Sequence, residues 1–133
     1  MLSIFFLLHF LADFSFQTLK MGREKSEKFT VLLQHIGIHF LVFFLGTIGI
    51  LGPGTAFLFS LLNATIHGII DWYVWRFYKY SVLKRHPKIA PDELKRTFKF
   101  WEDPLFIQII GFDQLLHSLT LVGLWQFFTS YLV

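Results

Sequence analysis

Four pairs of ionisable residues stand inside the most apolar stretches of this chain, and the members of each pair are four residues apart. The pairs are His9 and Asp13, His35 and His39, His67 and Asp71, and Asp113 and His117. A spacing of four places both side chains on one face of a helix. Imidazoles and carboxylates bind divalent metals, relay protons and act as general acids or bases. These eight residues are therefore the first candidates for chemistry.

The composition indicates that membrane helices position these pairs. Hydrophobic residues make up 54% of the 133 residues and charged residues only 16%, whereas soluble domains carry about a quarter charged residues. We therefore expect an all-α, polytopic membrane protein with a single transmembrane domain over residues 1–133. The chain has no cysteine, which excludes a disulfide framework and a thiolate metal site.

Four stretches are long and apolar enough to be predicted as transmembrane helices, since a span needs about 20 mostly apolar residues. They cover residues of about 2–19, 29–51, 55–78 and 105–133. The connection between the second and third is only a tight Gly-Pro-Gly turn, so these two must be antiparallel. We expect a four-helix bundle.

A fifth, shorter helix is predicted over about residues 91–101. Pro91 suits a first helical turn, and Leu94, Phe98 and Trp101 recur at helical spacing beside basic residues. This pattern is typical of an amphipathic helix lying in the membrane surface.

The distribution of positive charge predicts the orientation. All 12 Lys and Arg lie in two stretches, Lys20–Lys28 and Arg76–Lys99, which join the first span to the second and the third to the fourth. By the positive-inside rule both basic loops are cytoplasmic and both termini lie outside. We expect membrane lipids as partners, with the basic loops attracting anionic head groups, and no nucleic acid.

The pairs also match in depth when residues are counted inward from the cytoplasmic end of each span. The resulting two layers are roughly 6 Å apart. The layer nearer the cytoplasm would hold Asp13, His35, Asp71 and Asp113, and the deeper layer would hold His9, His39, His67 and His117. Eight ionisable groups would thus converge in the centre of the bundle.

A divalent metal explains this convergence better than the alternatives. Three carboxylates without a nearby cation would repel one another and take up protons, and hydrogen bonding between helices does not need eight ionisable groups. All eight residues are therefore predicted metal ligands, for one or two ions. Zinc is the first candidate, with Mn, Fe or Co as alternatives. Asp13 and Asp113, if unligated, could serve as general base; a proton-relay cluster remains the second hypothesis.

The four pairs lie in the segments "HFLADFSFQTLKMGREK", "HIGIH", "HGIIDW" and "FDQLLHSL". Together these segments resemble the domain of unknown function 3307 family of small bacterial inner-membrane proteins. The resemblance covers nearly the whole chain. It implies an inner-membrane location and no particular reaction. It marks as motif positions His9, Asp13, Gln17, His39, His67, Asp71, Asp113, Gln114 and His117.

Three functions remain open at this point. The first is a metal-dependent membrane hydrolase acting on a membrane-associated or anionic substrate. The second is a divalent-cation or proton transporter, which the nearly unbroken apolar runs "LSIFFLL" and "FLVFFLGTIGIL" disfavour for a single chain. The third is a metal-stabilised structural or sensory subunit. Gly37, Gly46 and Gly49 permit close helix contact, within the chain or in a homodimer.

Overall fold

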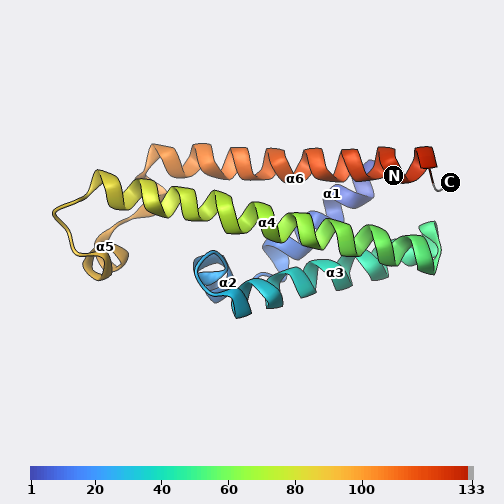
Figure 1. Cartoon of the computed structure of the whole chain (residues 1–133), viewed down its shortest axis with the longest axis horizontal. Helices are drawn as coiled ribbons and strands as arrows, with labels where there is room; N and C mark the ends of the chain where they lie inside the picture. Colours follow the sequence, from blue (N-terminus) through green and yellow to red (C-terminus); the bar gives the residue numbers. More distant parts are fainter. Residues whose placement is uncertain (132–133) are drawn as a thin grey trace.

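The structure, a computed structural model, describes the backbone of residues 1–131 and their side chains except those of residues 95, 96 and 131. Within this part every regular element is helical, as predicted. The elements are α1 (Leu2–Phe10), the π-helical turn η1 (Leu11–Ser15), α2 (Leu19–Glu24), α3 (Phe29–Leu51), α4 (Pro53–Arg85), α5 (Pro91–Thr97), the 3-10 turn η2 (Phe100–Glu102) and α6 (Pro104–Tyr131). Figure 1 shows the beginning and end of the described chain beside the turn that joins α3 to α4.

Among the residues that the structure describes, three helices are long and apolar enough to cross a membrane: Phe29–Leu51, Pro53–Arg85 and Pro104–Ser130. The predicted span 29–51 is confirmed at both ends by α3. The predicted span 55–78 lies within α4, which continues to Arg85 beyond the apolar stretch. The predicted span 105–133 corresponds to α6, and its last two residues lie outside the described part.

The first span was predicted too long. The continuous helix formed by α1 and η1 covers Leu2–Ser15, about 21 Å at 1.5 Å per residue, whereas the hydrocarbon core is about 30 Å thick. The chain breaks because Thr18 is extended and caps a new helix, its Oγ1 accepting a hydrogen bond from Met21 N at 3.2 Å. The described part of the chain thus holds three helices of spanning length and one shorter apolar helix.

The π-helical turn determines where Asp13 points. Phe16 N donates a hydrogen bond to Leu11 O at 2.9 Å, which inserts one extra residue into the turn. Such π-turns occur frequently at functional sites. Asp13 lies inside this turn and is buried, while its neighbour Phe14 is exposed.

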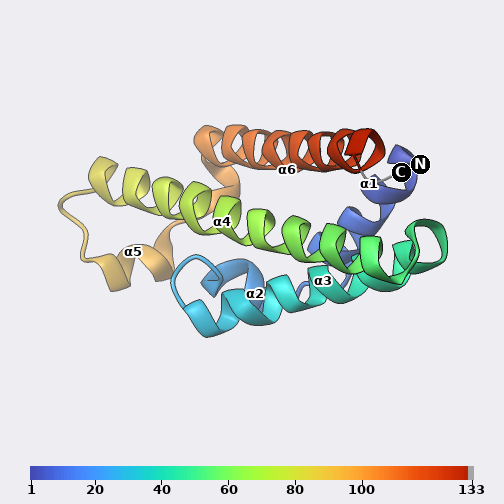
Figure 2. The same cartoon turned by 45° about the vertical axis from the view of Figure 1, so that its right-hand side comes forward.

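Two glycines determine the packing of α3 against α4. Gly52 has a φ of +75°, a left-handed conformation that glycine adopts without strain, and Pro53 then starts α4. Further along, a Cβ atom at Gly68 would lie 2.7 Å from Ile36 Cγ2, so the missing side chain permits close contact. Figure 2 shows α3 and α4 side by side, with α1 running between the end of α6 and α3.

The fifth helix differs from the predicted amphipathic helix at 91–101. It begins at Pro91 as predicted but ends at Thr97, and Trp101 lies in the separate turn η2. Leu94 is only 4% exposed because it packs against Val74 and Tyr78 of α4. The apolar face of this helix is thus covered by the bundle, and a position in the membrane surface is not shown.

Asp103 joins this loop to the end of α4. Its carboxylate accepts hydrogen bonds from Arg85 at 3.1 and 2.6 Å and from Tyr78 Oη at 3.1 Å. The Arg85 guanidinium holds the pKa of Asp103 below its usual range, although burial opposes this shift.

We expect Asp103→Asn to lower the free energy of unfolding by about 1.5 kcal/mol, because it removes charge-assisted bonds to a half-exposed arginine. A lowered carboxyl pKa stabilises the fold above the unfolded-state value of about 3.9, and this contribution is lost as the pH falls further. Unfolding of both proteins at pH 7 and at pH 3 should therefore show a difference at pH 7 that shrinks at pH 3. An equal difference at both values would contradict this prediction.

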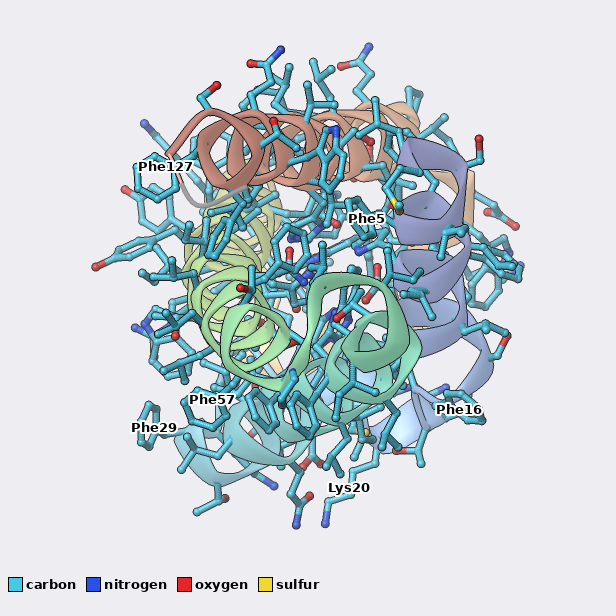
Figure 3. The ribbon with its side chains drawn as sticks, turned by 90° about the vertical axis from the view of Figure 1, so that its right-hand side faces the viewer. Phe5, Phe16, Lys20, Phe29, Phe57 and Phe127 are labelled. Atoms are coloured by element: carbon cyan, nitrogen blue, oxygen red, sulfur yellow. The ribbon has the colours of Figure 1, made fainter. Side chains whose placement is uncertain are left out.

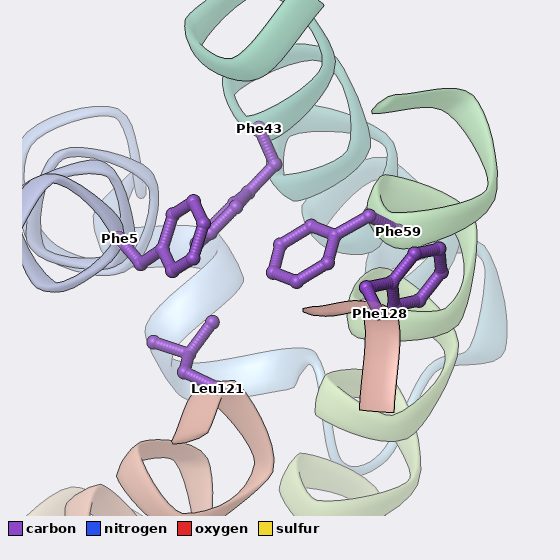
Figure 4. Close-up of a cluster of buried hydrophobic side chains, with 5 residues drawn as sticks. All are labelled: Phe5, Phe43, Phe59, Leu121 and Phe128. Atoms are coloured by element: carbon purple, nitrogen blue, oxygen red, sulfur yellow. The ribbon is translucent and has the colours of Figure 1, made fainter. Parts of the chain in front are cut away.

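Five buried apolar side chains, which we call the aromatic plug, fill the bundle near the α3–α4 turn. Figure 4 shows them pointing toward one another from α1, α3, α4 and α6. They are Phe5, Phe43, Phe59, Leu121 and Phe128. The ring centroids of Phe5 and Phe59 are 4.9 Å apart. In the end-on view of Figure 3, Phe5 lies between the helices, whereas Phe16, Phe29, Phe57 and Phe127 point away from the centre.

Candidate metal centre

All eight predicted ligands lie in one buried cluster below the aromatic plug. Their exposed fractions range from 0 to 6%. Each pair comes from one helical segment, α1 with η1, α3, α4 or α6. The two members of a pair lie on one face, as the contacts between His67 and Asp71 at 3.1 Å and between His117 and Asp113 at 3.7 Å illustrate. The structure thus brings together every residue that the spacing singled out.

A lysine that the sequence analysis assigned to a cytoplasmic loop lies inside this cluster. Lys25 is 4% exposed. Its Nζ is 2.8 Å from Asp71 Oδ2, 3.3 Å from Asp13 Oδ1 and 3.2 Å from His35 Nε2. The premise that the three carboxylates have no nearby cation is therefore wrong.

The corner between α2 and α3 is fixed on both sides of Lys25 by the end of α4. Arg76 Nε donates a hydrogen bond to Ser26 O at 2.8 Å, and Lys79 Nζ donates one to Arg23 O at 2.7 Å. The Arg76 guanidinium also lies 3.7 Å above the Trp72 ring. These contacts hold the corner against the bundle, so the Lys25 side chain reaches inward.

Lys25 is charged in this position. Burial lowers the pKa of an ammonium, but the neighbouring carboxylates of Asp71 and Asp13 hold the pKa of Lys25 above its ordinary value. The ammonium therefore neutralises one of the three buried carboxylates.

The imidazoles form a stack on the plug side of the carboxylates. The ring of His67 lies between those of His39 and His117, with centroid distances of 3.6 and 4.0 Å. His9 contacts all three rings, and its closest centroid distance is 5.1 Å, to His117. Both ring nitrogens of His39 and of His117 are buried without a hydrogen-bond partner. Such groups are costly unless a ligand satisfies them.

Gln114 connects α6 to the first helix across the cluster. Its Nε2 donates hydrogen bonds to Asp13 Oδ2 at 3.1 Å and to Asp113 Oδ2 at 3.3 Å, and its Oε1 lies 3.3 Å from His9 Nε2. The other oxygen of Asp113, Oδ1, is buried without a partner. Asp113 therefore keeps one oxygen that can accept a proton.

The described residues form three groups whose ligand atoms lie within 4.8 Å of one another. Tetrahedral zinc, with bonds of about 2.0–2.1 Å, needs donor atoms about 3.3 Å apart. Small side-chain movements would therefore bring the atoms of one group to the spacing that zinc needs. The groups are Asp13, His35, His39 and His67; His9, His67 and His117; and Asp13, Asp113 and His117. These buried groups could hold a metal ion.

Two residues of the cluster were not among the predicted ligands. Gln114 is one of the motif positions of the family resemblance, and in the structure it donates hydrogen bonds to two of the carboxylates. Lys25 was missed, although a signal existed: three acids in apolar runs require positive charge, and Lys25 ends the first segment quoted above. A basic residue beside a membrane span can turn inward as well as outward.

Over residues 1–131 these features define an all-helical protein with three helices that are long and apolar enough to span a membrane and with a buried His/Asp cluster. The chain belongs to the family described as "Protein of unknown function (DUF3307)", whose model matches residues 1–133. The predicted family resemblance is confirmed over the whole chain. No curated protein and no solved structure matches it.

Proposed function

We propose that this protein is a membrane-embedded metalloprotein that binds one divalent cation, zinc being the first candidate, and that it acts as a hydrolase. The observation that supports metal binding most directly is His117. It belongs to two of the three ligand groups, and both of its ring nitrogens are buried without a partner. A divalent ion would satisfy such a nitrogen.

The ion would be held on the α6 side of the cluster, away from Lys25. Donors there are the imidazoles of His117, His9 and His67, and Asp113, the carboxylate of α6 with an unpartnered oxygen, stays unligated. A set of three imidazoles leaves one position of a tetrahedral zinc ion for water, and Mn, Fe or Co are alternatives. Asp71 and Asp13 are engaged by Lys25 and so belong to the opposite side.

Charge supports one ion over two. Three carboxylates (Asp13, Asp71 and Asp113) and one ammonium (Lys25) give the described cluster a net charge of −2 when its imidazoles are neutral. One divalent cation brings this to zero, whereas two would leave a buried charge of +2. Uncompensated charge is expensive at this depth.

The aromatic plug supports hydrolysis over transport. The plug residues are at most 1% exposed, and the buried polar side chains of α3 and α4 on that side of the cluster, Thr47, Ser60 and Asn63, are uncharged. A cation passing from the cluster toward the α3–α4 turn would therefore meet mainly apolar side chains and no charged group among the described residues. A pathway through a membrane needs polar groups along its length. A hydrolase needs access from one side only.

Asp113 is the candidate general base. Its unpartnered oxygen is free to accept a proton, while both oxygens of Asp13 already accept hydrogen bonds, from Lys25 and from Gln114. A bound divalent ion would lower the pKa of water and so supply a nucleophile at neutral pH. Gln114 is the half-buried residue that covers both carboxylates, so we place substrate entry between η1 and α6.

The membrane setting that we propose is the bacterial inner membrane, with the basic loops in the cytoplasm and both termini outside. The substrate would be an amphiphile with an anionic head group, because lysines and arginines dominate the two loops. Gly37 and Gly49 have open space where a side chain would be, which fits contact with a second chain.

The test is elemental analysis of protein purified in mild detergent, followed by assay of ester and phosphoester amphiphiles in vesicles. We expect one equivalent of metal per chain. Asp113→Asn should lower turnover by about 10²–10⁴-fold, because a positioned general base contributes that much. His86→Ala, in the loop after α4, is the control. Absence of metal from the wild-type protein, even after incubation with Zn²⁺ and Mn²⁺, would overturn the proposal.

A further inference from the structure

We propose that Lys25 occupies the second of two cation positions in this cluster, so that the wild-type chain binds one divalent ion and a chain lacking this ammonium binds two. This inference rests on the metal-binding part of the proposed function. It assigns to Lys25 the control of how many ions the cluster accepts.

The groups around the ammonium are arranged as metal ligands are. Lys25 Nζ contacts one oxygen each of Asp13 and Asp71 and the Nε2 atom of His35. His35 Nε2 is 3.1 Å from Asp71 Oδ2 and 3.3 Å from Asp13 Oδ1. These distances between donor atoms are close to those in tetrahedral zinc sites, where neighbouring donor atoms lie about 3.3 Å apart. A small divalent ion would therefore find its donors already gathered where the ammonium lies.

His39 provides a fourth donor that the lysine does not use. It shares a ligand group with Asp13, His35 and His67, and neither of its ring nitrogens has a hydrogen-bond partner. The ammonium, which only donates hydrogen bonds, sits among three other acceptors. A divalent ion in place of the ammonium would have an imidazole nitrogen available to complete its coordination.

Charge explains why the position is closed in the wild-type chain. With Lys25 in place, one divalent ion neutralises the cluster, and a second would add two uncompensated positive charges. Lys25→Glu exchanges +1 for −1, and this difference of two charges equals one additional divalent ion. Lys25→Met removes the charge and keeps a side chain of similar length.

The experiment measures bound metal in the full-length chain in detergent after incubation with Zn²⁺ and removal of free ions. We expect one ion in the wild type and two in Lys25→Glu, a twofold increase. Lys28→Glu makes the same charge change three residues away, on a side chain that is 58% exposed, and should keep one ion. Each variant is prepared with and without Zn²⁺, because an ion replacing the ammonium should also restore the fold.

Each outcome decides a separate point. One ion in both the wild type and Lys25→Glu would overturn the inference and leave the proposed function standing. No ion in the wild type would overturn the proposed function, and the inference of two positions would fall with it. If Lys25→Glu does not fold, Lys25→Met is measured in its place, and two bound ions support the inference. Failure of both variants to fold in the presence of Zn²⁺ would overturn the inference, since a second ion should replace the missing ammonium.

Discussion

Replacement of His67 by alanine should abolish metal binding, with a loss of affinity of more than about 100-fold. Substitution of residues that merely support a ligand costs about 10–100-fold, and His67 is itself a candidate ligand in two of the three groups. Its ring lies between those of His39 and His117 and is almost fully buried. No other side chain can reach the same position, because the stack is closed on both sides.

The measurement is metal content of the purified variant together with titration of Zn²⁺ into the chelator-treated protein. His86→Ala is the matched control, because this histidine belongs to none of the candidate groups and contacts only Phe98 among the described rings. Helicity and elution volume should remain those of the wild type, which separates loss of a ligand from loss of the fold. Unchanged metal content in His67→Ala would exclude His67 as a ligand. Negligible metal in the wild type as well would favour the proton-relay hypothesis.

The sequence predicted the long helices well because their signals are local. The span 29–51 agrees with α3 at both ends, since an apolar run followed by the Gly-Pro-Gly turn determines where it stops. The i, i+4 spacing of His and Asp likewise predicted which face of each helix turns inward, and these residues lie together in the structure. An ionisable side chain within a transmembrane segment almost always faces the interior of the helix bundle, because contact with lipid is costly.

The features that were missed depend on contacts between distant residues or on small backbone changes. Hydropathy does not show that Thr18 starts a new helix or that the first helix ends in a π-helical turn that contains Asp13. Lys25 turns inward because Arg76 and Lys79 of α4 hold the neighbouring carbonyl groups, an arrangement that involves residues some fifty positions apart along the chain. Leu94 packs on α4 for a similar reason: its helix follows a loop whose path the local pattern does not determine.

Lys25→Ala should destabilise the metal-free protein by about 3–5 kcal/mol, the cost of removing one partner from a buried ion pair. The ammonium contacts Asp71 Oδ2 at 2.8 Å and Asp13 Oδ1 at 3.3 Å, and both carboxylates would then be buried between the helices without this cation. Lys28→Ala removes a surface ion pair, with Glu24 at 2.9 Å. It should cost no more than about 1 kcal/mol, because such a pair is solvated.

Removing a carboxylate together with the lysine should restore part of the stability that Lys25→Ala loses. Lys25→Ala combined with Asp71→Asn restores the net charge of −2, and we expect the double variant to be more stable than Lys25→Ala alone. The effect of the double variant should differ from the sum of the two single effects by about 0.5–3 kcal/mol, the range found for contacting residues. Denaturant unfolding in detergent with excess chelator measures the wild type, Lys25→Ala, Asp71→Asn and the double variant under one condition. If the two substitutions simply add, Lys25 and Asp71 do not form a pair in the folded protein, and the lysine would have no part in balancing the charge of the cluster.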